Sequence, residues 1–251
     1  MHRHIPNFIT ILNLLTGIIG IWFVLESNPF TGALFIFIAA IFDFLDGFSA
    51  RLLNAFSKIG KSLDSLADVV SFGVLPGIII YKLQSIALGT GADFEWGNNI
   101  CATEKIFLIL PLIIPALSAI RLARFDNDER QTIEFRGLPT PANALFIAAW
   151  MASYPVLNQK LEWLFDPSFI AIVSTLLAIL MIMDFPMFSL KFKSLQFKPN
   201  LIRYIFIGIS IFLIALFKIP GILIIIILYI LISLGVNIIK NLTSKRYQID
   251  H

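Results

Sequence analysis

The sequence predicts an all-helical bundle that is embedded in a membrane. Three observations lead to this fold class: 58% of the 251 residues are hydrophobic, only 14% are charged, and the mean hydropathy is +0.86. Soluble domains carry roughly 25% charged residues. Because the backbone finds no water inside a bilayer, a segment that crosses it bonds to itself as a helix. We therefore expect a polytopic α-helical membrane protein.

About eight apolar windows are long enough to cross the hydrocarbon layer, which takes roughly 20 helical residues. The fifth window is less apolar because it contains Asn143, and the last two are separated only by a turn at Pro220. We expect these helices to form one integral membrane domain over residues 1–251, with C-terminal helices at about 167–240. In chain order the windows cover residues 7–25, 30–53, 61–83, 104–124, 139–157, 167–186, 200–218 and 220–240.

The distribution of basic residues predicts the orientation. Lys and Arg accumulate in the cytoplasmic loops of membrane proteins. With the N-terminus in the cytoplasm, 15 of the 19 basic residues fall on the cytoplasmic side, and the other side receives Lys82, Lys105, Lys160 and Lys218. We expect both termini in the cytoplasm and a bacterial inner membrane as the location. We interpret the net charge of +3 as membrane anchoring, with no nucleic-acid partner.

Four carboxylates inside apolar windows are the strongest functional signal. Asp43 and Asp46 are three residues apart and Asp64 and Asp68 are four apart, so each pair shares one helix face. Both pairs lie near the cytoplasmic ends of their helices, where they can face each other. Ionisable groups at membrane depth are costly and usually functional.

A divalent cation is the natural partner of such a cluster. Carboxylates that converge repel one another unless a cation offsets them. Oxygen ligands without a nearby His or Cys favour Mg²⁺, Ca²⁺ or Mn²⁺ over zinc, and Mg²⁺ is commonly shared with substrate phosphates. Gly47 permits close approach to the helix, and Arg51 is a bidentate phosphate donor. We predict a metal-bridged diphosphate site that faces the cytoplasm.

These residues resemble the signature of the CDP-alcohol phosphatidyltransferase family. The match has the spacing Asp43-x-x-Asp46-Gly47-x-x-Ala50-Arg51, then eight residues, then Gly60-x-x-x-Asp64-x-x-x-Asp68, over residues 43–68. Further stretches resemble one branch, the membrane-integral phosphatidylserine synthases of bacteria and archaea: Pro6-Asn7 with Thr10 and Asn13, residues 63–76, 121–125 and 137–142. The resemblance covers about residues 5–145. Asn143 is a local departure, since many relatives carry alanine there.

The resemblance implies an enzyme that transfers a phosphatidyl group from CDP-diacylglycerol to L-serine and releases CMP. It implies a homodimer and two divalent ions, Mg²⁺ or Mn²⁺, that assist attack by the serine hydroxyl. The metal ligands would be Asp43, Asp46, Asp64 and Asp68, with Asp68 also the general base. The residues that match CDP-diacylglycerol contacts are Gly47, Arg51, Ser57, Asn7 and Thr10. The candidates for binding the serine carboxylate are Arg121 and Arg124.

Two other functions stay open on the sequence. Members of the same family use inositol, glycerol 3-phosphate or other alcohols as acceptors and share the eight-residue signature. Intramembrane acids also mark cation or proton transporters, although these usually distribute polar groups along a path to both faces. In a third interpretation the acids form a structural ion-pair network with Arg51, Lys58 and Lys61.

Several of the other candidates have a structural alternative. Ser57 can be a helix cap. Asn7 and Thr10 can simply open the first helix. Arg121 and Arg124 can be membrane anchors on the cytoplasmic side.

Overall fold

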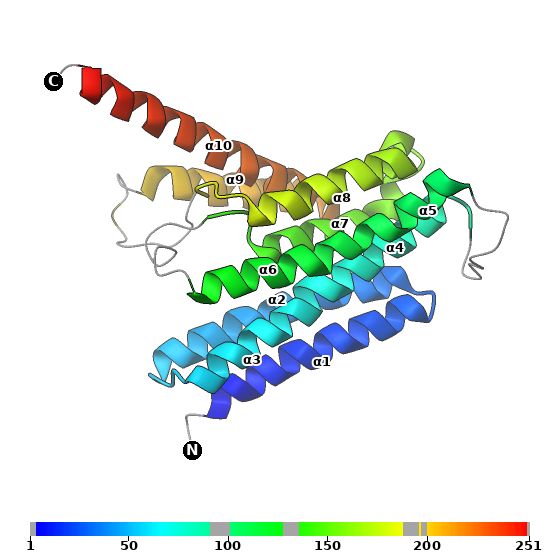
Figure 1. Ribbon diagram of the computed structural model, residues 1–251, viewed down its shortest axis with the longest axis horizontal. Helices are drawn as coiled ribbons and strands as arrows, with labels where there is room; N and C mark the ends of the chain where they lie inside the picture. Colours follow the sequence, from blue (N-terminus) through cyan, green and yellow to red (C-terminus); the bar gives the residue numbers. More distant parts are fainter. Residues whose placement is uncertain (1–3, 91–100, 128–135, 188–195, 197–199, 250–251) are drawn as a thin grey trace.

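The computed structural model describes residues 4–90, 101–127, 136–187, 196 and 200–249, with the side chains of the last helix described up to residue 237. The regular elements of these residues are helical, and an isolated antiparallel bridge joins Arg136 to Pro186. The predicted all-helical bundle is confirmed. Figure 1 shows the helices running beside one another along the long axis of the molecule.

The first three windows fold as helical segments joined by short turns. They contain α1 (Ile5–Leu25), α2 (Pro29–Leu52), α3 (Lys58–Val69), a π-helical turn (Val70–Val74) and α4 (Leu75–Ala87). Asn28 caps α2 by accepting a hydrogen bond from the backbone N–H of Thr31 at 3.2 Å, and Pro29 follows at the first helical turn, where a missing N–H costs nothing. The continuous helical segment from α3 through α4, 30 residues long, is long and apolar enough to cross a membrane.

The remaining windows form the second half of the bundle. They contain α5 (Ala102–Ile109), a 3-10 turn (Leu110–Leu112), α6 (Ile113–Asn127), α7 (Thr140–Leu157), α8 (Pro167–Ile182), α9 (Leu201–Phe217) and α10 (Ile219–Ile249). Each of the eight predicted windows thus falls on helix. By length and composition, five helical segments of the described chain can cross a membrane, and α8 and α9 are shorter apolar helices. The chain is an integral membrane protein.

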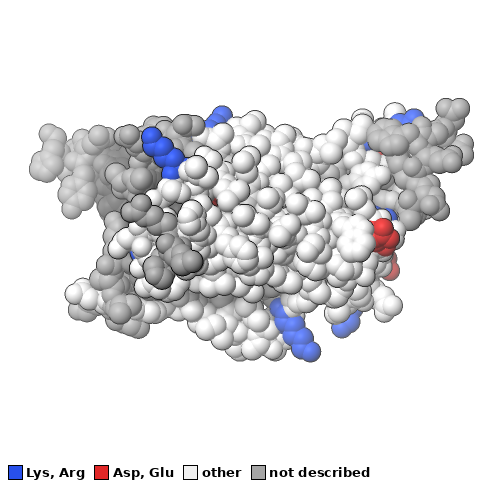
Figure 2. All heavy atoms as spheres, turned by 90° about the horizontal axis from the view of Figure 1, so that it is seen from below, with Lys and Arg blue, Asp and Glu red and all other residues white. Residues whose placement is uncertain are grey.

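The core lies around α7, which packs against α2, α4 and α10. Ile147 and Trp150 of α7 are almost fully buried, as are Ile79 and Leu83 of α4. The outer surface is also apolar. Figure 2 shows a broad face of uncharged side chains, and the charged side chains visible on it lie mostly at its margins. Such a surface suits contact with lipid.

The first helix packs along α2 and also against α3, so it touches both helices that carry the acids. Close approach to α2 depends on Gly32, because a Cβ atom there would lie 2.8 Å from the carbonyl oxygen of Gly20. Small residues at such crossings let membrane helices approach closely. The first helix is therefore placed within side-chain reach of both acidic pairs.

Candidate active site

Three of the four predicted acids meet in one group. Asp43 of α2 and Asp64 and Asp68 of α3 each offer a carboxylate oxygen, and these oxygens lie within 4.8 Å of one another. Asp68 is buried, whereas the other two are half-buried. Oxygen ligands at this spacing fit a hard divalent cation such as Mg²⁺ or Mn²⁺, which would also offset their mutual repulsion.

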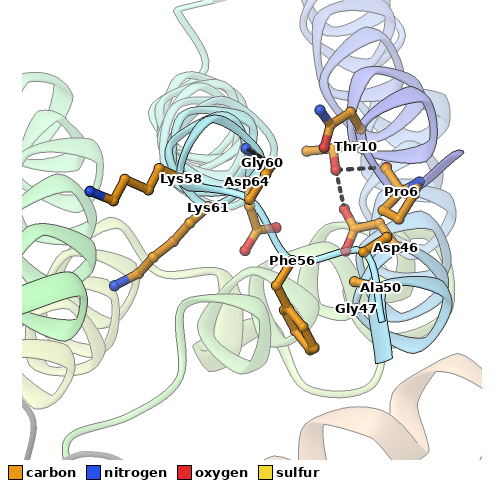
Figure 3. A pocket seen from close by; sticks show the side chains of 13 residues that line it. Pro6, Thr10, Asp46, Gly47, Ala50, Phe56, Lys58, Gly60, Lys61 and Asp64 are labelled. Atoms are coloured by element: carbon orange, nitrogen blue, oxygen red, sulfur yellow. Dashed lines mark hydrogen bonds between the residues drawn. The ribbon is translucent and has the colours of Figure 1, made fainter. Parts of the chain in front are cut away.

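Asp46 lies outside that group of three, although it shares a helix face with Asp43. Its side chain is 5% exposed, and its Oδ2 atom accepts a hydrogen bond of 2.7 Å from the Thr10 hydroxyl. Figure 3 shows this bond, with Asp46 and Asp64 on two different helices beside the same pocket. The two acidic pairs therefore converge as predicted, with Asp46 held toward α1.

The first helix supplies a donor to each acid-bearing helix. Thr10 donates to Asp46 on α2, and the side-chain amide of Asn13 donates to Oδ1 of Asp68 on α3 at 3.3 Å. Asn13 is itself fixed from the other side, because the Ser71 hydroxyl donates to its backbone carbonyl at 3.0 Å. Sequence reasoning noted Asn13 in the family resemblance but gave it no place in the site. Its signal was the three-residue spacing of Asn7, Thr10 and Asn13 in an otherwise apolar helix.

A cavity of about 530 Å³ adjoins these acids, a size typical of small-molecule sites. It lies between α1, the end of α2 and the start of α3. Four residues predicted to contact the nucleotide donor line it: Asn7, Thr10, Gly47 and Ser57. The complete lining is Pro6, Asn7, Thr10, Asp46, Gly47, Ala50, Ala55, Phe56, Ser57, Lys58, Gly60, Lys61 and Asp64.

The two signature glycines have different surroundings. A Cβ atom at Gly47 would meet nothing within 4 Å, so this glycine is not required for packing and leaves the cavity wall open beside Asp46. A Cβ atom at Gly60 would lie 2.7 Å from Oδ1 of Asn7 and 2.9 Å from the Ser57 hydroxyl. Gly60 therefore lets α1 and the start of α3 close on each other, while Gly47 leaves room for a ligand.

Ser57 lines the cavity, whereas Arg51, which was also predicted to contact the nucleotide donor, does not. Ser57 is the N-cap of α3, since its hydroxyl accepts a hydrogen bond of 2.9 Å from the backbone N–H of Gly60. Ser57 is thus a helix cap, as the structural alternative predicted, and it also lines the cavity. Arg51 lies in the last turn of α2, directly after the cavity-lining Ala50, and its side chain is exposed.

The two candidate serine-binding arginines have unlike environments. Arg121 of α6 is 6% exposed, and its Nη1 donates to the Thr140 hydroxyl at 3.3 Å. Its helix also packs against α3, which carries Asp68. Arg124 is exposed, and its Nη1 donates to the backbone carbonyl of Ile182 at the end of α8, at 3.2 Å.

Fold and site together define a class: an integral membrane protein whose converging carboxylates can hold divalent cations beside a substrate-sized cavity. The chain belongs to the CDP-alcohol phosphatidyltransferase family, whose sequence pattern matches residues 3–182.

Similar proteins include several that are named CDP-diacylglycerol–serine O-phosphatidyltransferase. The protein from Mycobacterium leprae is 34% identical over 155 residues, which are 59% of this chain and 46% of that protein. The Bacillus subtilis protein is 33% identical over 156 residues, 62% of this chain and 80% of its own length. The Methanocaldococcus jannaschii protein is 35% identical over 146 residues, 58% of this chain and 59% of that protein. This chain thus spans about half of the mycobacterial relative and most of the one from Bacillus.

Proposed function

We propose that this protein transfers the phosphatidyl group of CDP-diacylglycerol to L-serine, giving phosphatidylserine and CMP. The observation that carries the proposal is the group of Asp43, Asp64 and Asp68 next to a cavity whose wall is open at Gly47. Membership of the family supports phosphatidyl transfer, and the names of the relatives support serine as the acceptor.

Asp43, Asp46, Asp64 and Asp68 would hold the metal, two ions of Mg²⁺ or Mn²⁺. Their oxygens are the donor type that these ions prefer. When bound, such ions neutralise charge on a diphosphate and on its leaving oxygen. The alternative in which the acids form an ion-pair network with Arg51, Lys58 and Lys61 is less favoured, because the oxygens of three acids gather within 4.8 Å of one another.

Asp68 would act as the general base. The hydroxyl oxygen of serine forms the new bond to the phosphorus that carries diacylglycerol, its proton passes to the Asp68 carboxylate, and the bond from that phosphorus to CMP breaks with its electrons on the CMP oxygen. The Asn13 amide donates to Oδ1 of Asp68, which orients the carboxylate.

The donor nucleotide would occupy the cavity. Asn7, Thr10, Gly47 and Ser57 line it, and Arg51 directly follows the lining residue Ala50, with a guanidinium that can bind phosphate bidentately. Thr10 would act through Asp46, whose carboxylate it fixes.

We further propose a single integral membrane domain in a bacterial inner membrane, with a cytoplasmic active site and both termini in the cytoplasm. The bias of 15 of 19 basic residues to one side supports this orientation. Homodimer formation is proposed from the family resemblance. An active site in this orientation is accessible to both substrates, since CDP-diacylglycerol arrives from the membrane and serine from the cytoplasm.

The test is to incubate the purified full-length protein with CDP-diacylglycerol, Mg²⁺ and one acceptor at a time. The acceptors are L-serine, inositol, glycerol 3-phosphate and choline, and lipid product and CMP are both measured. We expect phosphatidylserine and CMP in equal amounts with serine, and slower transfer to the others. A clear preference for inositol or glycerol 3-phosphate would assign the protein to another branch of the family.

A further inference from the structure

A buried hydroxyl in the π-helical turn bonds to a neighbouring helix. Ser71 is fully buried, and its hydroxyl donates to the backbone carbonyl of Asn13 on α1 at 3.0 Å. A buried serine in a helix often bonds a carbonyl of its own helix, as Ser174 and Ser233 do. Ser71 instead crosses to the residue whose side chain bonds Asp68.

Asn13 is held from two directions by the same segment of chain. Its side-chain amide donates to Oδ1 of Asp68 at 3.3 Å, and its backbone carbonyl accepts from Ser71, three residues after Asp68. The amide oxygen of Asn13 is buried and finds no hydrogen-bond partner among the residues that the structure describes. The direction of this amide therefore depends on where the backbone of Asn13 is held.

Close packing on two sides fixes the place of Ser71. A Cβ atom at Gly17, four residues after Asn13 on α1, would lie 3.0 Å from Cα of Ser71 and would collide with its hydroxyl. On the other side, a Cβ atom at Gly73 would lie 3.0 Å from Cβ of Ser118 on α6. The two glycines let the π-helical turn fit between α1 and α6. Such turns are frequent at functional sites.

The orientation of Asp68 matters for the proposed chemistry. A general base must lie within hydrogen-bond reach of the hydroxyl that it deprotonates, and a displacement of about 1 Å can cost about 100-fold in rate. One Asp68 oxygen also lies within 4.8 Å of oxygens of Asp43 and Asp64. The rotation of the carboxylate thus decides which oxygen faces the metal and which faces the acceptor.

We propose that Ser71 is a positioning residue for the general base and acts through Asn13. The Ser71 hydroxyl holds the backbone of Asn13, and the Asn13 amide in turn holds the carboxylate of Asp68. This role needs no contact between Ser71 and either substrate. The inference rests on the proposed function, in which Asp68 takes the proton, and adds a residue that lies two contacts away from it.

The test is a double-mutant cycle of Ser71→Ala and Asn13→Leu in the full-length protein, with CDP-diacylglycerol, L-serine and saturating Mg²⁺. Asn13→Leu should lower kcat by about 10- to 100-fold, because it removes a bond to a charged group. Ser71→Ala should lower kcat by about two- to tenfold, the range of a neutral bond, with both KM values within about twofold of the wild type. In the Asn13→Leu background it should lower kcat no further, because the amide that it positions is gone.

Thermal unfolding of the same variants separates positioning from support of the fold. The Ser71 bond ends on a backbone carbonyl, which Asn13→Leu retains, so Ser71→Ala should lower the melting temperature equally in both backgrounds. A purely structural role would lower kcat equally in both as well. Ser174→Ala is the matched control and should keep the wild-type kcat, because this equally buried hydroxyl donates to the carbonyl of Ala171 in its own helix, at 3.3 Å.

Two further variants keep the test decisive. Asn13→Ala replaces Asn13→Leu if the latter fails to fold, and Gly17→Ala should lower kcat as Ser71→Ala does, because its methyl group displaces the Ser71 hydroxyl. An unchanged kcat in Ser71→Ala, or an equal loss in both backgrounds, refutes the positioning role while the proposed function stands. Transfer to another alcohol in place of serine refutes the proposed acceptor, and the cycle run with that alcohol still decides the role of Ser71. No transfer to any alcohol refutes both.

Discussion

Polar side chains of α1 reach neighbouring helices as well as bonding within their own, whereas Ser210 of α9 and Ser233 of α10 donate to backbone carbonyls of their own helices. In the N-terminal part, hydroxyls and amides reach from one helix to another, as Thr10 does to Asp46 and Asn13 to Asp68. In α9 and α10, by contrast, Ser210 donates to a backbone carbonyl four residues earlier in its own helix, at 2.8 Å. Ser233 does the same at 2.7 Å. Bonds between helices fix side chains for chemistry, whereas bonds within a helix only satisfy a hydroxyl in an apolar setting. The comparison predicts that substitutions of equal size will have very different effects in the two parts.

The largest effect should come from the metal ligands. Asp43→Asn keeps the size of the side chain but removes a charged oxygen ligand, and an excess of EDTA should remove the metal itself. Both should abolish transfer to below about a thousandth of the wild-type rate, because a metal clamp contributes several kcal/mol to such reactions. Added Mg²⁺ or Mn²⁺ should restore the EDTA-treated enzyme. Full turnover in excess EDTA would disprove the metal site, and normal membrane insertion of Asp43→Asn is the control.

The next largest loss of rate should come from Asp68→Asn, and it should distinguish a general base from a metal ligand. Asp68→Asn should lower the rate by about 10² to 10⁴, the range that a placed general base contributes. CDP-diacylglycerol should still bind to it in the presence of metal, while Asp46→Asn should weaken both binding and rate. The measurement is substrate binding to each detergent-purified variant beside its initial rate at saturating serine. Near-normal turnover by Asp68→Asn would remove it from the base role, and lost binding would make it primarily a ligand.

A smaller effect should follow from removing one donor of α1. Thr10→Val deletes the hydrogen bond to the Asp46 carboxylate, and bonds to charged groups contribute about 1.5 to 3 kcal/mol, or a factor of about 10 to 100. Thr16→Val is the matched control on the same helix, because the Thr16 hydroxyl donates to the backbone carbonyl of Leu12 at 2.6 Å. Rates and CDP-diacylglycerol binding of both variants should be compared. Equal losses would mean that Thr10 only supports the helix.

The smallest effect should come from α9. Ile211 is 64% exposed on the apolar surface, so Ile211→Ala removes lipid contact and leaves the core unchanged. Its rate should match the wild type, and its thermal stability should change by no more than about 0.5 kcal/mol. A marked loss of activity would show that this part of the bundle also shapes the site.

The helices and the acids follow from the sequence for simple reasons. Apolar length defines a membrane helix, so the windows were found, although α8 and α9 end before a full span. The three-residue and four-residue spacings place each acidic pair on one helix face, and the oxygens of Asp43, Asp64 and Asp68 do meet. These conclusions depend only on the apolar composition of the windows and on the periodicity of an α-helix.

The partners of the acids did not follow from the sequence. The spacing of Asn7, Thr10 and Asn13 indicates which side of α1 faces the acids, but which donor meets which acid depends on how α1 packs against α2 and α3. The sequence therefore drew attention to Asn13 without predicting its bond to Asp68. It predicted that Thr10 contacts the nucleotide without predicting the bond from Thr10 to Asp46. Likewise Arg121 and Arg124 look equivalent in sequence, and only packing against Thr140 and Ile182 separates them.

The π-helical turn at Val70–Val74 inserts one extra residue into the helix that runs from Asp68 to the buried residues of α4. The N–H of Leu75 bonds the carbonyl of Val70, so the turn contains one residue more than an α-helical turn. Deleting a single valine there would restore a regular helix and keep almost the same composition. The extra residue is taken up inside that one turn, so the helix on either side keeps nearly the same phase, and Ile79 and Leu83 would stay in the core. The deletion would instead change the directions of the side chains within the turn, among them Ser71, whose hydroxyl donates to the backbone carbonyl of Asn13. The extra residue therefore matters for the contacts around Asp68 more than for the core of α4.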